Sequence, residues 1–347
     1  MEPKPISGRD RMLGVVKRLL PLAFGVATLA YLFVSGKVDI DDVKLKVAHI
    51  ETGPLSTALL LGGVGFMASA LRLQYLVSLL GYRVSFVRSL VYTLVGQLYN
   101  SAIPGGTVGG DAIKALYLSS HTHHKAHAFA AVLIDRICGL FTLGTFALIM
   151  LLPNIGEESM RAAAGVIIGF LGAGSLAVTL MLSRRVRRLF PDGAMSRLPM
   201  QGALKAFDDA VQIFRGRMGG IAIALMISLL PQFAWIAMHI AIGDGLNIAG
   251  VSWTDYCVLV PVSGMVAALP ISFGGWGVGE AASVYFFGQR GVPSDAAFVL
   301  SALGRLIQLA WALVALPISF FLPRPAQVAA ALAAEQEPGA QATGLKP

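Results

Sequence analysis

The sequence predicts an all-α polytopic membrane protein with six full crossings and two Gly/Pro-broken segments. Of its 347 residues, 56% are hydrophobic and only 13% are charged, whereas soluble domains carry about 25% charged residues. Apolar segments follow one another along nearly the whole chain, and none of the rest is long enough for a sizeable soluble enzyme. Residues 1–322 are therefore predicted to form a single transmembrane domain.

The six predicted crossings are segments whose apolar length matches the ~20 residues that a bilayer-spanning helix needs. They are approximately 17–36, 56–80, 128–152, 162–182, 219–243 and 296–322. The basic stretch before the first of them is not followed by a convincing small-residue cleavage site, so we expect a retained helix and not a signal peptide. Residues 323–347, rich in Ala, Gln, Glu and Gly, are predicted to be a disordered tail.

Lysine and arginine orient the chain, because cytoplasmic loops of membrane proteins carry an excess of both. The first 18 residues are basic, and so is the long loop 183–218, whereas 37–55 mixes acidic residues with lysines and 153–160 is acidic. Both termini are therefore predicted to be cytoplasmic, with the protein in the inner (cytoplasmic) membrane. The net charge of +8 lies beside apolar spans, so nucleic acid is not an expected partner.

Two further apolar stretches, about 87–119 and 254–290, are broken by glycine and proline, which interrupt helices. The first contains NSAIPGGTVGGDAIKALYL and the second LPISFGGWGVGEAASVYFF. Unpaired backbone in lipid is costly, so each is predicted to line a polar cavity as a re-entrant hairpin or as paired spans. Their structural-motif residues are Pro104, Gly105, Gly106, Gly109, Gly110, Pro270, Gly274, Gly275, Gly277 and Gly279.

The broken stretches are predicted to belong to an inverted-topology repeat, with motifs at about 87–152 and 254–322. A shift of 169 positions aligns Gly105 with Gly274, Gly106 with Gly275, Gly110 with Gly279, Asp111 with Glu280 and Arg136 with Arg305. The acid and the arginine are 25 positions apart in both copies. The first stretch is entered from the cytoplasm and the second from outside. Such paired interruptions are typical of a transporter's central binding site.

Seven ionisable residues are predicted to lie within the membrane, where charge is costly enough to mark substrate-binding candidates. They are Asp111, Arg136, Glu280, Arg305, Arg72, Lys114 and Asp135. Arginine suits a phosphate because its planar fork donates two parallel hydrogen bonds, and the carboxylates would bind a cationic group or carry protons. The alternative is that these residues form structural ion pairs, for example Asp111 with Arg136 and Glu280 with Arg305.

Signatures of covalent chemistry are missing from the sequence. It contains no phosphate-binding loop for ATP, and no Ser/His/Asp, Cys/His or paired-carboxylate metal arrangement stands out in the broken stretches. Its two cysteines, Cys138 and Cys257, both lie in apolar segments, which favours neither a disulfide framework nor a zinc site. The sequence therefore predicts a protein that is not an enzyme, without cofactor or metal.

The motifs PGGTVGGDAIKALYL, AVLIDRICGL and LPISFGGWGVGE resemble the membrane region of the lysylphosphatidylglycerol synthase/flippase family, the multiple peptide resistance factors and their stand-alone relatives. The resemblance covers roughly residues 15–322. It implies a lipid flippase whose functional positions are Asp111, Arg136, Glu280 and Arg305. The family's best-known members carry a soluble aminoacyltransferase domain after the membrane region. This chain ends shortly after residue 322, so synthesis of a lysyl lipid is not expected.

We therefore expect an ATP-independent lipid translocase that moves a head group between leaflets through a polar groove. Its expected partner is a membrane lipid, whether a phospholipid, a glycolipid, a hopanoid or a polyprenyl-linked lipid. Two alternatives stay open. One is a non-catalytic membrane partner of an enzyme in such a lipid pathway, in which the acids and arginines are structural. The other is an intramembrane lipid-modifying transferase or hydrolase, for which only Ser101, Ser119, Ser272 and Tyr117 offer hydroxyls near the glycine motifs.

Overall fold

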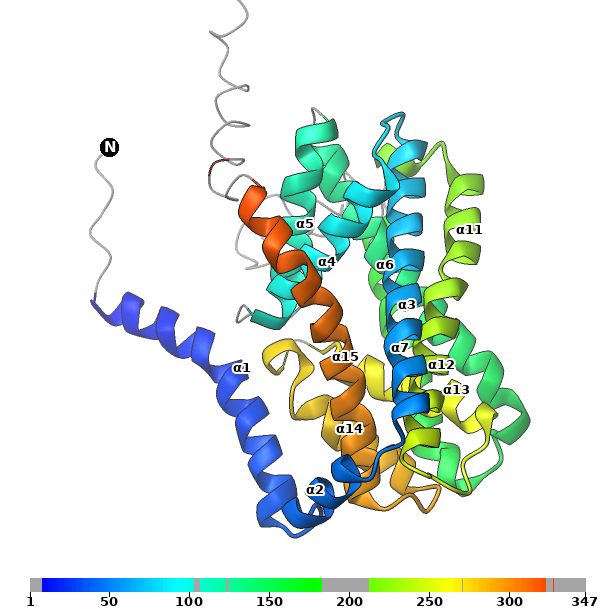
Figure 1. Ribbon diagram of the computed structural model, residues 1–347. Coiled ribbons are helices and arrows are strands. Elements are labelled where there is room, and N and C mark those ends of the chain that lie inside the picture. The colour runs from blue at the N-terminus through cyan, green and yellow to red at the C-terminus, as the bar shows by residue number, and fades with distance from the viewer. Residues whose placement is uncertain are drawn as a thin grey trace, which may run out of the picture.

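The computed structural model describes residues 8–102, 107–122, 125–182, 212–269, 271–322 and 327, and the regular elements in these residues are all helical (Figure 1). Five spans in them are long and apolar enough to cross a membrane. They are formed by α3 (Thr52–Leu79), α6 (Lys125–Leu151), α7 (Arg161–Leu182), α11 (Met218–Ile227) with α12 (Leu229–Gly245), and α15 (Ser294–Phe321). The all-helical prediction is thus confirmed, and five of the six predicted crossings correspond to helices of sufficient length and apolar composition.

The remaining predicted crossing corresponds to α1 (Gly8–Val34), whose apolar part, Leu20–Val34, is shorter than the other spans. After a turn at Gly36, which has a positive φ of 68°, the short helix α2 (Ile40–Ala48) begins. The Asp39 side chain caps α2 by accepting a hydrogen bond from the Asp41 backbone N–H, which satisfies one of the helix's free donors. A full crossing by α1 stays a prediction. The predicted tail lies outside the described residues, apart from Gln327.

The first broken stretch is a pair of helices, α4 (Phe86–Ala102) and α5 (Thr107–Thr122), which pack against each other. A Cβ on Gly110 would collide with the Gly96 carbonyl oxygen and with the Asn100 side chain. Because Gly110 lacks a Cβ, the Asn100 Oδ1 atom accepts a hydrogen bond of 2.8 Å from the Gly110 N–H. This hydrogen bond joins the first turn of α5 to α4. Pro104, Gly105 and Gly106 lie outside the described residues.

The second broken stretch consists of α13 (Trp253–Ala267), the 3₁₀ turn η3 (Phe273–Gly275) and α14 (Val278–Gly288). Gly274, Gly275 and Gly277 have φ values of 55°, 79° and 80°, a conformation that residues with a side chain adopt at a cost. The glycine cluster therefore has a local cause, since the chain reverses here to enter α14. Pro270 lies outside the described residues.

The two helix pairs lie at different levels of the molecule. In Figure 1, α4 and α5 lie toward the top and α13 and α14 toward the bottom, with α15 running past both pairs. Their inner ends meet, because Gly274 in η3 lies against the Asn100 carbonyl at the end of α4. On the opposite side α12 packs along α3. Long helices also pack against the broken ones, α3 and α15 against α4, α6 against α5 and α13, and α15 against α14, which shelters part of their backbone from lipid.

Candidate functional site

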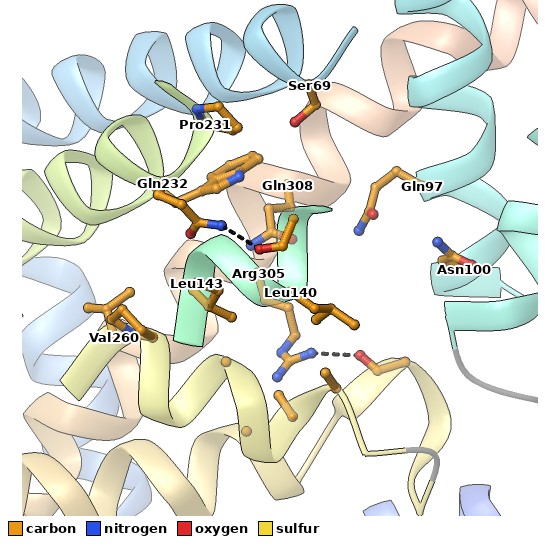
Figure 2. Close-up of a pocket in the computed structure, with 18 of the residues that line it drawn as sticks. Ser69, Gln97, Asn100, Leu140, Leu143, Pro231, Gln232, Val260, Arg305 and Gln308 are labelled. Carbon is orange, nitrogen blue, oxygen red and sulfur yellow. Dashed lines mark hydrogen bonds between the residues drawn. The ribbon is translucent and has the colours of Figure 1, made fainter. Parts of the chain in front are cut away.

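A cavity of about 410 Å³ lies between the two helix pairs and the long helices α3, α6, α12 and α15 (Figure 2). This volume falls in the range of small-molecule sites, about 300–1,000 Å³. Six of the seven charged residues that the sequence singled out line it: Arg72, Asp111, Lys114, Asp135, Arg136 and Arg305. The seventh, Glu280, is buried next to Arg305 and does not belong to the lining. Residues far apart in the sequence are thus gathered around one polar space.

Asp135 on α6 is the centre of a buried charge cluster. Its Oδ1 accepts a 2.6 Å hydrogen bond from Arg72 Nε, and its Oδ2 accepts a 2.8 Å hydrogen bond from Lys114 Nζ. Arg72 Nη1 also donates to Ser228 Oγ at 3.2 Å, at the break between α11 and α12. Both oxygens of the carboxylate are therefore engaged by cations. The cluster holds two positive charges against one negative charge, so it leaves the cavity wall positive.

The pair formed by Asp111 and Arg136 is looser. Arg136 Nε lies 3.6 Å from Asp111 Oδ2, and the exposed fractions of the two side chains are 33% and 24%. That distance is too long for a hydrogen bond. Within the described part of the chain, neither side chain has a hydrogen-bond partner. Arg136 thus lines the cavity with guanidinium donors that no described residue engages.

The pair formed by Glu280 and Arg305 is tight. Arg305 Nε donates to Glu280 Oε1 at 2.6 Å, while Nη1 and Nη2 donate to the carbonyl oxygens of Gly274 and Gly275 at 2.7 and 3.0 Å. Glu280 Oε2 in turn accepts a hydrogen bond of 2.6 Å from the Gly277 N–H, where α14 begins. The guanidinium also lies 5.3 Å from the centre of the Trp276 ring, within cation–π range. Arg305 therefore fastens the glycine turn to α15.

Neutral polar residues complete the lining, and sequence reasoning missed them. On α4 they are Thr93, Gln97 and Asn100, and on α15 they are Ser301 and Gln308, which flank Arg305. Spacings of three and four residues place each set on one helix face. Figure 2 shows Gln97, Gln232 and Gln308 around the cavity. The signal that would have found them is this spacing of polar residues inside apolar segments.

The hydroxyl groups considered for covalent chemistry are not gathered in one place. Of the four, Ser101 lines the cavity, whereas Ser119 donates to the Leu116 carbonyl and the Tyr117 ring stacks on Tyr92. The described residues also contain no group of three His, Cys, Asp or Glu side chains that could hold a metal ion. The geometry thus presents hydrogen-bond donors and charges for binding a ligand.

Comparison with known proteins places all the residues that line this cavity within one family match. The family model described as the lysylphosphatidylglycerol synthase TM region matches residues 19–316. The chain belongs to this family. The resemblance seen in the glycine motifs is thereby confirmed, and the family match extends over both broken stretches, four of the long spans and most of the fifth.

Two UPF0104 membrane proteins of archaea are similar to the chain. It is 21% identical over 258 residues to one from Methanocaldococcus jannaschii, an alignment that covers 68% of this chain and 74% of that protein. It is 23% identical over 250 residues to one from Pyrococcus horikoshii, covering 65% and 73%. No solved structure matches the chain. The family and these relatives make it a multi-pass membrane protein.

Proposed function

We propose that this protein is an ATP-independent lipid translocase, and not an enzyme, which moves a lipid with a phosphate-linked head group between leaflets. The observation that carries the proposal is the charged cavity enclosed by membrane-spanning helices. Charges inside a membrane are costly, and they are retained where they line the path of a polar substrate. The head group would occupy the cavity while the apolar tails stay in the bilayer, which avoids most of the cost of taking charge through hydrocarbon.

The proposal assigns the phosphate to Arg136. This arginine has uncommitted donors, and its partner Asp111 is 3.6 Å away, so a phosphate oxygen can replace the carboxylate at little cost. Bidentate binding of phosphate by arginine is stronger than a neutral hydrogen bond. Arg72 and Lys114, held in place by Asp135, would add positive potential. Asp111, released from Arg136, would then accept a proton or repel the phosphate when the head group leaves.

An inverted repeat would supply the movement. The acid and arginine of each copy contact each other in both halves, Asp111 with Arg136 and Glu280 with Arg305. The two helix pairs also occupy opposite ends in Figure 1. Rocking of two such halves about a central site is the usual route to alternating access. In this proposal the termini are cytoplasmic, the first pair opens to the cytoplasm and the second to the outside.

The test is lipid transport by the purified protein in liposomes that carry acyl-labelled phospholipids. We expect the wild type to accelerate exchange between leaflets, and Arg136→Gln to slow it about tenfold or more, the effect of losing one charge-assisted contact. Arg161→Gln is the matched control, because Arg161 lies outside the cavity in an exposed pair with Glu158 at 3.8 Å, and it should transport normally. A wild type without acceleration, or an Arg136→Gln variant as fast as the control, would refute the proposal.

A further inference from the structure

We propose that the head group accepted by this cavity is a sugar or cyclitol phosphate, which carries several hydroxyls and no amine. This inference rests on the proposed function and names the substrate class of the same site. It follows from which hydrogen-bonding groups of the cavity are already engaged and which are free. The carboxylates are largely engaged, whereas two side-chain amides are free.

The carboxylates offer poor recognition of an ammonium group. An ammonium only donates hydrogen bonds, so a buried one needs acceptors, preferably negative ones. Both oxygens of Asp135 accept from Arg72 and Lys114. Both oxygens of Glu280 accept from Arg305 and Gly277, behind the cavity wall. Of these three carboxylates, Asp111 is the one with room, so an ammonium would find a single negative acceptor even when a phosphate has taken the place of Asp111 at Arg136.

The amides offer good recognition of hydroxyls. Among the described residues, the side chains of Gln97 and Gln308 have no hydrogen-bond partner, and both line the cavity. Asn100 accepts from the Gly110 N–H through Oδ1, which leaves its NH₂ group as a donor. An amide both donates and accepts hydrogen bonds, and a hydroxyl does the same. Several hydroxyls on one ring can therefore exchange hydrogen bonds with several amides. A phosphate oxygen only accepts hydrogen bonds, so it can use only the NH₂ group of an amide.

The positions of the amides suit a head group with phosphate at one end and hydroxyls at the other. Gln97 lies one turn before Asn100 on α4, and Gln308 lies one turn after Arg305 on α15. Figure 2 places Gln97 and Gln308 at the same cavity as Arg305. Because α4 and α15 pack against each other, amides from both halves can hold one ring while Arg136 holds its phosphate.

The experiment compares three acyl-labelled lipids in liposomes that contain the wild type. They are phosphatidylinositol with its cyclitol hydroxyls, phosphatidylethanolamine with its amine, and phosphatidic acid with phosphate alone. We expect phosphatidylinositol to move about tenfold faster than the other two, because a site built for hydroxyls rejects ligands that lack them. This ranking requires no mutation, so it does not depend on how a variant folds.

Variants then test which side chains cause the preference for phosphatidylinositol. Gln97→Leu and Gln308→Leu should slow phosphatidylinositol about tenfold and slow phosphatidic acid much less, so that the two lipids move at similar rates. Gln289→Leu, an exposed glutamine at the end of α14, should behave as wild type. Phosphatidylethanolamine moving as fast as phosphatidylinositol, or leucine variants that slow all lipids equally, would overturn the inference and leave the translocase standing. A wild type that moves no lipid would overturn both.

Discussion

The two acid–arginine pairs of this chain have the same spacing and different surroundings. In the first half, Arg136 and Asp111 are 3.6 Å apart and partly exposed to the cavity. In the second, Arg305 is 2.6 Å from Glu280 and also bonds to two carbonyl oxygens. In the second half, the turn through Gly274 and Gly275 directs its carbonyl oxygens at Arg305, whereas the aligned Gly105 and Gly106 lie outside the described residues. The shared motif thus brings an acid and an arginine together in both halves, but it does not determine whether the pair holds the fold or binds a ligand.

The comparison suggests a division of labour between the halves. The Glu280–Arg305 pair uses both carboxylate oxygens and three of the five guanidinium donors in holding the turn and the start of α14. The Asp111–Arg136 pair keeps its capacity, and the cluster around Asp135 adds a positive charge nearby. The structural and the binding interpretations of the intramembrane charges are therefore both reasonable, each for a different half. Substitutions of the aligned residues in the two halves distinguish a structural pair from a ligand-binding pair.

The largest expected effect is a loss of stability in Arg305→Ala. The substitution leaves Glu280, whose side chain is 1% exposed, without its counter-charge. Breaking a buried ion pair in this way costs about 3–5 kcal/mol. Arg136→Ala should cost less than about 1 kcal/mol, since its pair is loose and partly exposed. Thermal unfolding of the purified variants in detergent measures the difference, and equal destabilisation by the two would contradict the division of labour.

A smaller effect is expected for the aligned glycines Gly110 and Gly279. In Gly110→Ala the new Cβ would collide with the Gly96 carbonyl, a backbone atom, so α4 and α5 must move apart. In Gly279→Ala it would collide with the end of the Arg305 side chain, which can give way by releasing Gly275. Overpacking costs about 1–3 kcal/mol, and we expect Gly110→Ala at the upper end of that range.

Gly169→Ala is the control for both glycine variants, because a Cβ at Gly169 in α7 would meet nothing within 4 Å. It should unfold at or slightly above the temperature of the wild type, since alanine favours the helix. The same thermal unfolding assay measures all three variants. A Gly279→Ala variant less stable than Gly110→Ala would show that the Arg305 contacts are more rigid than the packing of α4 on α5.

Six of the seven charged residues that the sequence singled out line the cavity, for a physical reason. Charges stand out in apolar segments, so Arg72 and Arg136 were found without knowledge of the fold. Their partners were harder to predict, because the sequence neighbours Asp135 and Arg136 pair with different residues. Asp135 pairs with Arg72 on α3 and Lys114 on α5, whereas Arg136 faces Asp111 on α5. The amides Gln97 and Gln308 were missed because neutral polar residues are less costly in membrane helices and attract less notice.

The position of a helix boundary was likewise hard to predict from the sequence alone. The predicted crossing 219–243 is divided at Ser228 into α11 and α12. Pro231 accounts for the break, since it has no N–H to donate to the Ile227 carbonyl. The sequence contains the proline, but a proline bends some membrane helices and leaves others continuous. The contact from Arg72 to Ser228 depends on that break and on the packing of α3 beside it, neither of which a single segment reveals.

The smallest change in stability is expected for Asp111→Asn, below about 1 kcal/mol, because the pair that it weakens is partly exposed. Its effect on transport should be specific. Without the carboxylate, nothing competes with a phosphate for Arg136, so the lipid binds more tightly and leaves more slowly. We expect half-saturation at a severalfold lower lipid fraction and a lower maximal rate, measured as exchange rate against the content of labelled lipid. Glu158→Gln, which removes the exposed partner of Arg161, should change neither quantity. An Asp111→Asn variant with unchanged half-saturation would mean that Asp111 does not compete for Arg136, and that the loose pair is structural like its counterpart.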